Sequence, residues 1–335
     1  MATAFESDVV RLTDFRANPD SMGRGKAIGM SVRSLRLQRN RTYALVSASG
    51  RGKSVFLSLL AGFPPFAWQN AMRWSAWEVF GKNILPPDGK RRNSFSPLFP
   101  IDGQNAIIYL PQTFPQDRAE DLPALEAMAF VLCVGGSAKS LAEARELVRE
   151  VACAEPFVLS AKNLDQPLHQ LSGGERRRLE LATRLTAIYP RNNASPAASG
   201  RRALILLDEP TTGLDVLSET RFQLFLYELV EKAHSNGTEI TTVVATHAFA
   251  HLVPDLPDSV EVLVLDRDEQ LAQPRPPPSM IRLVFQGSVR ESFEHFAQFA
   301  EGGKEMDGWR SIIEILERRS SPELERAFFD ESNDE

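Results

Sequence analysis

Residues 42–60 read TYALVSASGRGKSVFLSLL, and this stretch determines the fold of the chain. Its opening run TYALV predicts a short buried strand, residues 47–54 predict a glycine-containing loop, and the apolar residues that follow predict a helix. In such a loop, backbone N–H groups turn inward around a triphosphate, Lys53 reaches the terminal phosphates and Ser54 offers its hydroxyl to Mg²⁺. The new helix directs its positive end at the anion.

Composition excludes several classes of protein. The chain has 335 residues, 43% hydrophobic and 24% charged, which predicts a globular protein of about two domains. Its 38 basic and 44 acidic residues give a net charge of −6, so we expect no direct nucleic-acid partner. The sequence contains no apolar run of the roughly 18 residues that span a membrane and no signal-peptide pattern at its start, which predicts a cytoplasmic chain. Cys133 and Cys153 are predicted to be buried, reduced thiols.

The segments around the loop read mainly as strands. Residues 8–15 predict an edge strand, residues 27–37 a second strand and residues 77–84 a hairpin strand. Phe15 ends the first strand, and its ring either stacks on an adenine or is a half-buried core side chain. Three aromatic residues fit core or partner contacts better than a nucleic-acid stacking platform: Trp68, Trp74 and Trp77.

A block of helices interrupts the alternation of strands and helices that follows. Apolar spacing predicts helices over three ranges: 123–134, 141–153 and 175–187. Strands are predicted over four ranges: 105–110, 203–207, 239–245 and 260–265. The run at 203–207 fits a central parallel strand that ends in Asp208 and Glu209, where ligands bind in open α/β sheets. The basic side chains of residues 176–178 are predicted to be solvated. After residue 266 the sequence predicts a Pro-rich linker and then helical stretches near 291–300 and 308–319.

The string Leu171-Ser172-Gly173-Gly174-Glu175 narrows the interpretation. With it the chain resembles the ATP-binding cassette (ABC) family of ATPases, whose signature motif more commonly has Gln at the last of these positions. The other family motifs follow in order: Gln112, Asp208-Glu209, Thr212-Gly213-Leu214-Asp215 and His247. One departure is Ser47, which stands where the family loop begins with Gly and must avoid a positive φ angle or be forced into one.

The resemblance implies the fold and the domains. It implies an α/β P-loop NTPase of the ABC type, with a mostly parallel core sheet, an antiparallel β edge and an inserted helical subdomain over about residues 115–185. The nucleotide-binding domain would span residues 1–270. Residues 271–335 would form a Pro-rich linker and a helical, acidic C-terminal extension.

The resemblance also implies the site. Glu209 would orient and deprotonate the attacking water, His247 would contact the γ-phosphate, and Gln112 would sense the metal and the γ-phosphate; with Lys53 these are the expected catalytic residues. Mg²⁺ would be held by Ser54, Gln112 and Asp208. ATP would contact a larger set of residues: Phe15, Ser49, Gly50, Arg51, Gly52, Lys53, Ser54, Val55, Ser172, Gly173, Gly174, Glu175 and Asp215.

The implied function is that of an ATP-hydrolysing subunit that forms a head-to-tail dimer around two ATP molecules and drives a separate transmembrane subunit at the inner face of the cell membrane. Glu175 is similar to the residue of the lipoprotein-release and macrolide-export branch. The alternative is a non-transport ABC ATPase that acts in assembly or repair, such as iron–sulfur assembly. A cassette without catalysis would lack Lys53, Glu209 or His247, and this chain has all three.

Overall fold

The computed structural model describes these residues: 8–17, 29–48, 50–65, 68, 71–84, 105–111, 121–134, 140–154, 157–186, 201–211, 216–235, 237–245, 260–268 and 280–297. The chain divides into two compact units. One contains residues 1–99 and 243–335, and the other contains residues 100–242. No helix within the described ranges has both the length and the apolar character needed to cross a bilayer.

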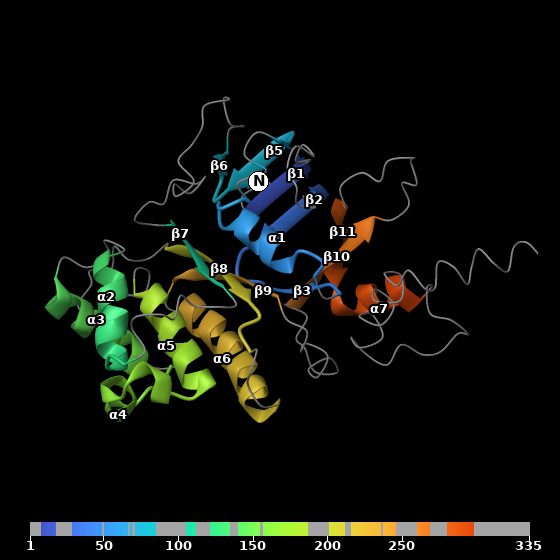
Figure 1. Ribbon diagram of the computed structural model, residues 1–335. Coiled ribbons are helices and arrows are strands. Elements are labelled where there is room, and N and C mark those ends of the chain that lie inside the picture. Colours follow the sequence, from blue (N-terminus) through green and yellow to red (C-terminus); the bar gives the residue numbers. More distant parts are fainter. Residues whose placement is uncertain are drawn as a thin grey trace, which may run out of the picture. The chain divides into compact units, whose positions relative to one another are not determined.

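The first unit is built on a mixed sheet with the strand order β6-β5-β1-β2-β11-β10-β3 (Figure 1). Its strands are β1 (Asp8–Ala17), β2 (Gly29–Gln38), β3 (Thr42–Val46), β4 (Met72–Arg73), β5 (Ala76–Val79), β6 (Lys82–Asn83), β10 (Val260–Asp268) and β11 (Met280–Ser288). Strand β3 is buried along its whole length and pairs in parallel with β10, as the continuous apolar run TYALV predicts. Helix α1 (Lys53–Leu60) follows it after the loop.

Strand β1 is not the predicted edge strand. It pairs with β2 on one side and with β4 and β5 on the other. The hairpin of β5 and β6 adds the extra strands, and it turns at Phe80 and Gly81, whose φ angles of 51° and 75° suit a tight two-residue turn. The hairpin was predicted from residues 77–84, but its pairing with β1 was not.

Strand β11 is the main departure from the predicted organisation. It lies between β10, with which it pairs antiparallel, and β2, with which it pairs in parallel. No strand was predicted after residue 266, and the predicted domain boundary at residue 270 therefore separates two strands that pair with each other. Helix α7 (Val289–Ala297) follows β11 directly and contacts β10 and β11, and it overlaps the predicted helical stretch near 291–300.

The second unit contains the predicted block of helices. Strands β7 (Asn105–Leu110) and β8 (Arg202–Asp208) pair in parallel. Strand β9 (Glu239–Ala245), of which only residues 239–242 belong to this unit, lies beside β8. The helices are α2 (Ala124–Val134), α3 (Leu141–Cys153), α4 (Ala161–Asp165), the 3₁₀ turn η2 (Leu168–Gln170), α5 (Gly173–Leu185) and α6 (Val216–Ser235). The side chains of residues 203–207 are almost completely buried, which confirms the predicted central strand.

Two smaller predictions on this unit were wrong. The cysteines are free, but Cys153 is exposed and Cys133 is only half-buried, because each lies near the C-terminal end of a helix at the surface. Arg176 and Arg177 are not solvated. Their side chains are 17% and 13% exposed, because both turn toward the buried carboxylate of Glu180.

Candidate functional site

The loop of residues 47–54 has the backbone that its glycines predict. Gly50 and Gly52 have φ angles of 70° and 81°, in the left-handed region that favours glycine. Ser47 is not among the described residues with positive φ, so its replacement of Gly introduces no left-handed strain. Its hydroxyl donates to the Ala48 carbonyl over 3.0 Å, and Lys53 Nζ donates to the Ser47 carbonyl over 3.4 Å. The lysine side chain is therefore folded over its own loop and is 7% exposed.

The N-terminus of α1 is open to an anion. Gly52 is the N-cap residue, no side chain caps it among the described residues, and the first turn carries no acidic residue. An α-helix leaves the N–H groups of its first turn without partners within the helix, and its dipole favours negative charge there. Ser54 in this turn is exposed. This end of the helix is therefore suited to a phosphate group.

Phe15 does not offer a ring face to adenine. Its side chain is fully buried, and its ring stacks on Trp74 at a centroid distance of 6.3 Å and meets Trp77 edge-on at 5.8 Å. Trp68 is a third ring near it, and Trp68 and Trp77 are themselves buried. The prediction that Phe15 stacks on a base was wrong in this structure, because the tryptophans surround its ring. The prediction that the tryptophans are core residues is confirmed for Trp68 and Trp77, whereas Trp74 is half-buried.

In the second unit, the carboxylate of Asp208 lies at the end of β8. It is 2% exposed, and the Tyr109 hydroxyl donates to its Oδ2 over 3.4 Å from the neighbouring strand β7. Burial and the nearby Asp208 raise the pKa of Tyr109, so its hydroxyl keeps the proton that it donates. The role of Tyr109 could not be predicted from the sequence, because its contact depends on which strand pairs with β8.

Glu209 has an unusual backbone conformation. Its φ angle is 48° and its side chain is mostly buried, with the residue 9% exposed. A residue with a β-carbon costs about 1–2 kcal/mol in the left-handed region. Strained residues of this kind cluster at active sites, where the surrounding structure holds them in place. The strain agrees with a functional carboxylate at this position.

The signature string begins helix α5 with a complete capping box. Ser172 Oγ accepts the Glu175 N–H over 3.3 Å, and Glu175 Oε2 accepts the Ser172 N–H over 2.9 Å. The Ser172 hydroxyl also donates to Glu175 Oε2, and the other carboxylate oxygen accepts the Asn163 amide over 2.9 Å. Burial raises the pKa of Glu175, but these hydrogen bonds and the positive charge of Arg178 lower it by more, so the net pKa is below the ordinary value.

Gly174 leaves space next to this capped helix end. A β-carbon placed on it would have no described atom within 4 Å. Ser172 and Gly173 are exposed, so the start of α5 is accessible to another molecule.

Helix α5 is also tied to strand β7. Arg177 Nη1 donates to the Pro111 carbonyl over 3.3 Å and to Glu180 Oε2 over 2.9 Å, and Arg176 Nε reaches Glu180 Oε1 at 3.2 Å. The Glu180 side chain is 1% exposed. Pro111 directly precedes Gln112 in the sequence. The signature helix thus holds the end of the strand that leads to a predicted catalytic residue.

The predicted site residues divide between the two units. Gly50, Arg51, Gly52, Lys53, Ser54 and Val55 lie together in the first unit, and Ser172 to Glu175, Asp208 and Glu209 lie in the second. Four predicted site residues lie outside the described residues: Ser49, Gln112, Asp215 and His247.

The family is established by comparison with known proteins. A family model described as ABC transporter matches residues 31–212, more than half of the chain. The chain belongs to this family. The ABC assignment is consistent with the uncapped start of α1, the acidic end of β8 and the signature helix described above. It implies ATP binding and ATPase activity.

Two of the named relatives are ATP-binding proteins of import systems. The vitamin B12 import ATP-binding protein BtuD of Vibrio cholerae is 27% identical over 235 residues, which cover 70% of this chain and 78% of BtuD. The taurine import ATP-binding protein TauB of Pseudomonas aeruginosa is 29% identical over 200 residues, 58% of this chain and 59% of TauB.

Solved structures confirm the fold. The structure of cbiO1 from Clostridium perfringens, part of the ABC transporter complex cbiONQ, matches with a TM-score of 0.54 and 20% identity, over 86% of this chain and 92% of cbiO1. A nucleotide-free ATP-binding cassette from an ABC transporter also gives a TM-score of 0.54, at 15% identity, over 94% of this chain and 96% of the cassette.

Proposed function

We propose that this ABC chain binds and hydrolyses Mg-ATP, dimerises head to tail and drives a separate membrane protein. The observation that carries the proposal is the contrast between two helix ends: α1 begins without a side-chain cap beside the buried Lys53, whereas α5 begins with its own capping box and open space at Gly174. The first end needs an anion to satisfy it, and the second can meet an anion that another chain holds.

The residues present fit ATP and Mg²⁺. Glycines at positive φ let the loop backbone approach phosphates closely, and the buried Lys53 supplies a cation. The Ser54 hydroxyl and the Asp208 carboxylate are hard oxygen donors of the kind that Mg²⁺ prefers. When bound, Mg²⁺ would neutralise charge on the phosphates. Tyr109 would orient Asp208, Glu209 would accept a proton from the attacking water, and Gln112 and His247 keep their predicted roles at the γ-phosphate.

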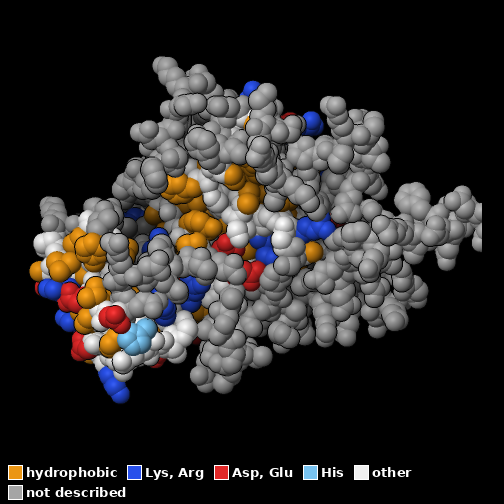
Figure 2. Space-filling model, in the orientation of Figure 1, with side chains coloured by type: hydrophobic (Ala, Val, Ile, Leu, Met, Phe, Trp, Pro, Cys, Tyr) orange, Lys and Arg blue, Asp and Glu red, His pale blue; other side chains and the backbone are white. Residues whose placement is uncertain are grey.

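A membrane partner is supported by the names of the relatives and by exposed apolar side chains on the helices of the second unit. Figure 2 shows hydrophobic side chains gathered over α2 and α3. On these helices, Phe130 of α2 is 61% exposed and Leu141 of α3 is 37% exposed. Val158, between α3 and α4, is 64% exposed and has a φ angle of 48°, strained for a β-branched residue. Apolar groups held in solvent at a cost suggest a surface that another protein covers. The relatives' import names favour import, and the export-branch likeness of Glu175 stays a prediction.

The chemistry is tested with Glu209→Gln. The substitution keeps the size of the side chain but removes the base, so steady-state phosphate release should fall by about 10²–10⁴-fold while ATP binding persists and a closed dimer accumulates. Phosphate release, isothermal titration with ATP and size-exclusion chromatography measure the three effects. Undiminished hydrolysis would contradict the role of Glu209, and hydrolysis without added Mg²⁺ would contradict the metal.

The transport role is tested by purification in mild detergent. A multi-span protein that co-purifies and accelerates hydrolysis would support a membrane complex at the inner face of the cell membrane. Isolation on an assembly scaffold instead would favour the non-transport alternative.

A further inference from the structure

We propose that Ile281 on β11 is a positioning residue for the phosphate-binding loop, and that β11 thereby makes nucleotide affinity depend on the C-terminal part of the chain. The proposal rests on the proposed nucleotide function of the loop. It assigns a role to a residue that sequence analysis had placed outside the nucleotide-binding domain.

The contact lies at Gly52. The ideal position of a β-carbon on Gly52 is only 2.2 Å from Ile281 Cδ1, 3.5 Å from Cγ1 and 3.8 Å from Cγ2. The end of the isoleucine side chain therefore occupies the space that any other residue at position 52 would fill with its own side chain. Two independent features therefore favour glycine at position 52: its φ angle of 81° and this contact.

The isoleucine is held firmly from both sides. Ile281 is 2% exposed, and its backbone pairs with Met30 of β2 and with Arg267 of β10. A buried, β-branched side chain on a strand paired on both edges has few alternative rotamers. It provides a rigid surface behind the loop.

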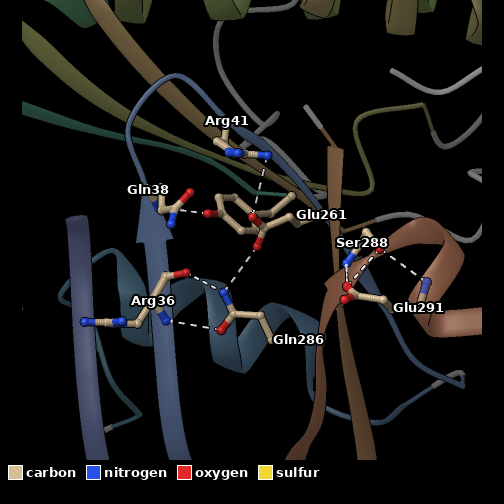
Figure 3. A network of polar contacts seen from close by, with 8 residues as sticks. Arg36, Gln38, Arg41, Glu261, Gln286, Ser288 and Glu291 are labelled. Atoms are coloured by element: carbon tan, nitrogen blue, oxygen red, sulfur yellow. Dashed lines mark hydrogen bonds and ion pairs between the residues drawn. The ribbon is translucent and has the colours of Figure 1, made fainter. Parts of the chain in front are cut away.

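Further along β11, side chains extend this attachment (Figure 3). The Gln286 amide oxygen accepts the Arg36 N–H over 3.1 Å and its nitrogen donates to the Arg36 carbonyl, so one side chain continues the hydrogen-bonding pattern between β11 and β2. Gln286 also reaches Glu261 of β10 at 3.5 Å, and Glu261 pairs with Arg41 at 3.8 Å. These contacts fix the position of β11 relative to β2 and β10.

Helix α7 anchors the other end of β11. Ser288 Oγ accepts the Glu291 N–H over 3.2 Å, and Glu291 Oε2 accepts the Ser288 N–H over 2.7 Å. Phe296 of α7 is buried, and its ring lies 6.1 Å from that of Phe285 on β11. A displacement of α7 would therefore act on the strand that carries Ile281.

The consequence concerns Lys53 and the first turn of α1, which follow Gly52 directly. The direction of their N–H groups depends on the position of Gly52, and misdirected hydrogen bonds to a charged phosphate can weaken binding about 10- to 100-fold. Shortening the side chain of Ile281 would leave a void behind the loop, into which Gly52 can relax. We expect weaker nucleotide binding rather than slower chemistry on bound nucleotide.

The test compares Ile281→Ala with Ile281→Val and two controls in the full chain. Val284→Ala changes an exposed residue of the same strand, and Val262→Ala truncates a fully buried residue of β10. ATP affinity is measured by isothermal titration, kcat by phosphate release, and loop opening by hydrogen exchange of peptides over residues 47–57 without nucleotide. Ile281→Ala should weaken ATP binding about 10- to 100-fold and speed loop exchange, with kcat at saturating ATP nearly unchanged. Ile281→Val should lie close to the wild-type protein.

Equal ATP affinity in Ile281→Ala and Val262→Ala, with the loop exchanging at one rate in both, would overturn the proposal and leave Ile281 as an ordinary core residue. Failure of the proposed function would appear differently, as a wild-type chain that neither binds nor hydrolyses ATP. The exchange measurement needs no nucleotide, so it tests the contact between Ile281 and the loop in either case.

Discussion

The two helix ends of the candidate site solve the same physical problem in opposite ways. Both α1 and α5 begin with N–H groups that lack partners within the helix. At α1, Gly52 supplies no cap and Lys53 adds a positive charge nearby. At α5, Ser172 and Glu175 satisfy each other's backbone N–H groups and place a negative charge at the helix start.

The difference indicates which end needs a ligand to be satisfied. The start of α1 has no side-chain cap and no acidic residue in its first turn, so we propose that it is the end that holds the chain's own anion. The start of α5 has its own capping box. The helix is further held by the ion pairs of the buried Glu180 with Arg176 and Arg177. A capped end on a rigid helix suits a surface that meets an anion only when two chains come together.

The largest effect on the free energy of unfolding is expected at the buried ion pairs of α5 between Glu180 and the two arginines Arg176 and Arg177. Glu180→Ala leaves two largely buried arginine side chains without their carboxylate, and breaking a buried ion pair costs about 3–5 kcal/mol of unfolding free energy. Urea unfolding of the variant measures this loss. The matched control is Glu294→Ala, which breaks the exposed pair of Glu294 with Arg290 and should cost about 1 kcal/mol or less. Similar losses in both variants would show that α5 does not depend on the buried pair.

An intermediate effect is expected on ATP affinity, and it should distinguish the start of α1 from the start of α5. Lys53→Ala removes a charge-assisted phosphate contact, so ATP binding to the dilute, monomeric chain should weaken about 10- to 100-fold. Ser172→Ala should leave that affinity unchanged, cost about 1 kcal/mol of unfolding free energy and reduce hydrolysis at high protein concentration. Titration with ATP at low protein concentration measures the difference. Weaker binding by the dilute Ser172→Ala chain would mean that the signature acts on its own ATP.

The smallest effect concerns pH. The lowered pKa of Glu175 means that its capping contribution is complete at pH values above the ordinary value of 4.5 and is lost as pH falls through the lowered value. Glu175→Gln keeps a side chain able to close the box, so it should remove this part of the acid sensitivity, about 1 kcal/mol or less. Thermal unfolding between pH 6 and pH 3 measures it. Glu291→Gln is the matched control, because the hydrogen bonds from Ser288 also lower the pKa of Glu291.

The sequence predicted well the strand, loop and helices that carry the candidate site, because their signals are local. The apolar run of residues 42–46, the loop glycines and the N-cap Ser172 form elements from residues that are neighbours in the chain. It failed at Phe15, whose burial depends on three tryptophans from another segment, and at the arginines of α5, whose partner Glu180 is buried only by tertiary packing. Tyr109 was missed for the same reason, since only strand pairing brings it to Asp208.

From its amino-acid order alone, this chain specifies a strand, a phosphate-binding loop and a helix, an acidic strand end and a capped signature helix, because backbone propensities and short spacings suffice for each. The tertiary structure adds β11 between β2 and β10, the hydrogen bonds of Gln286 with a residue 250 positions away, and Ile281 against Gly52. These contacts join segments that are far apart in the chain. Their energy comes from pairing and close packing that no local pattern records.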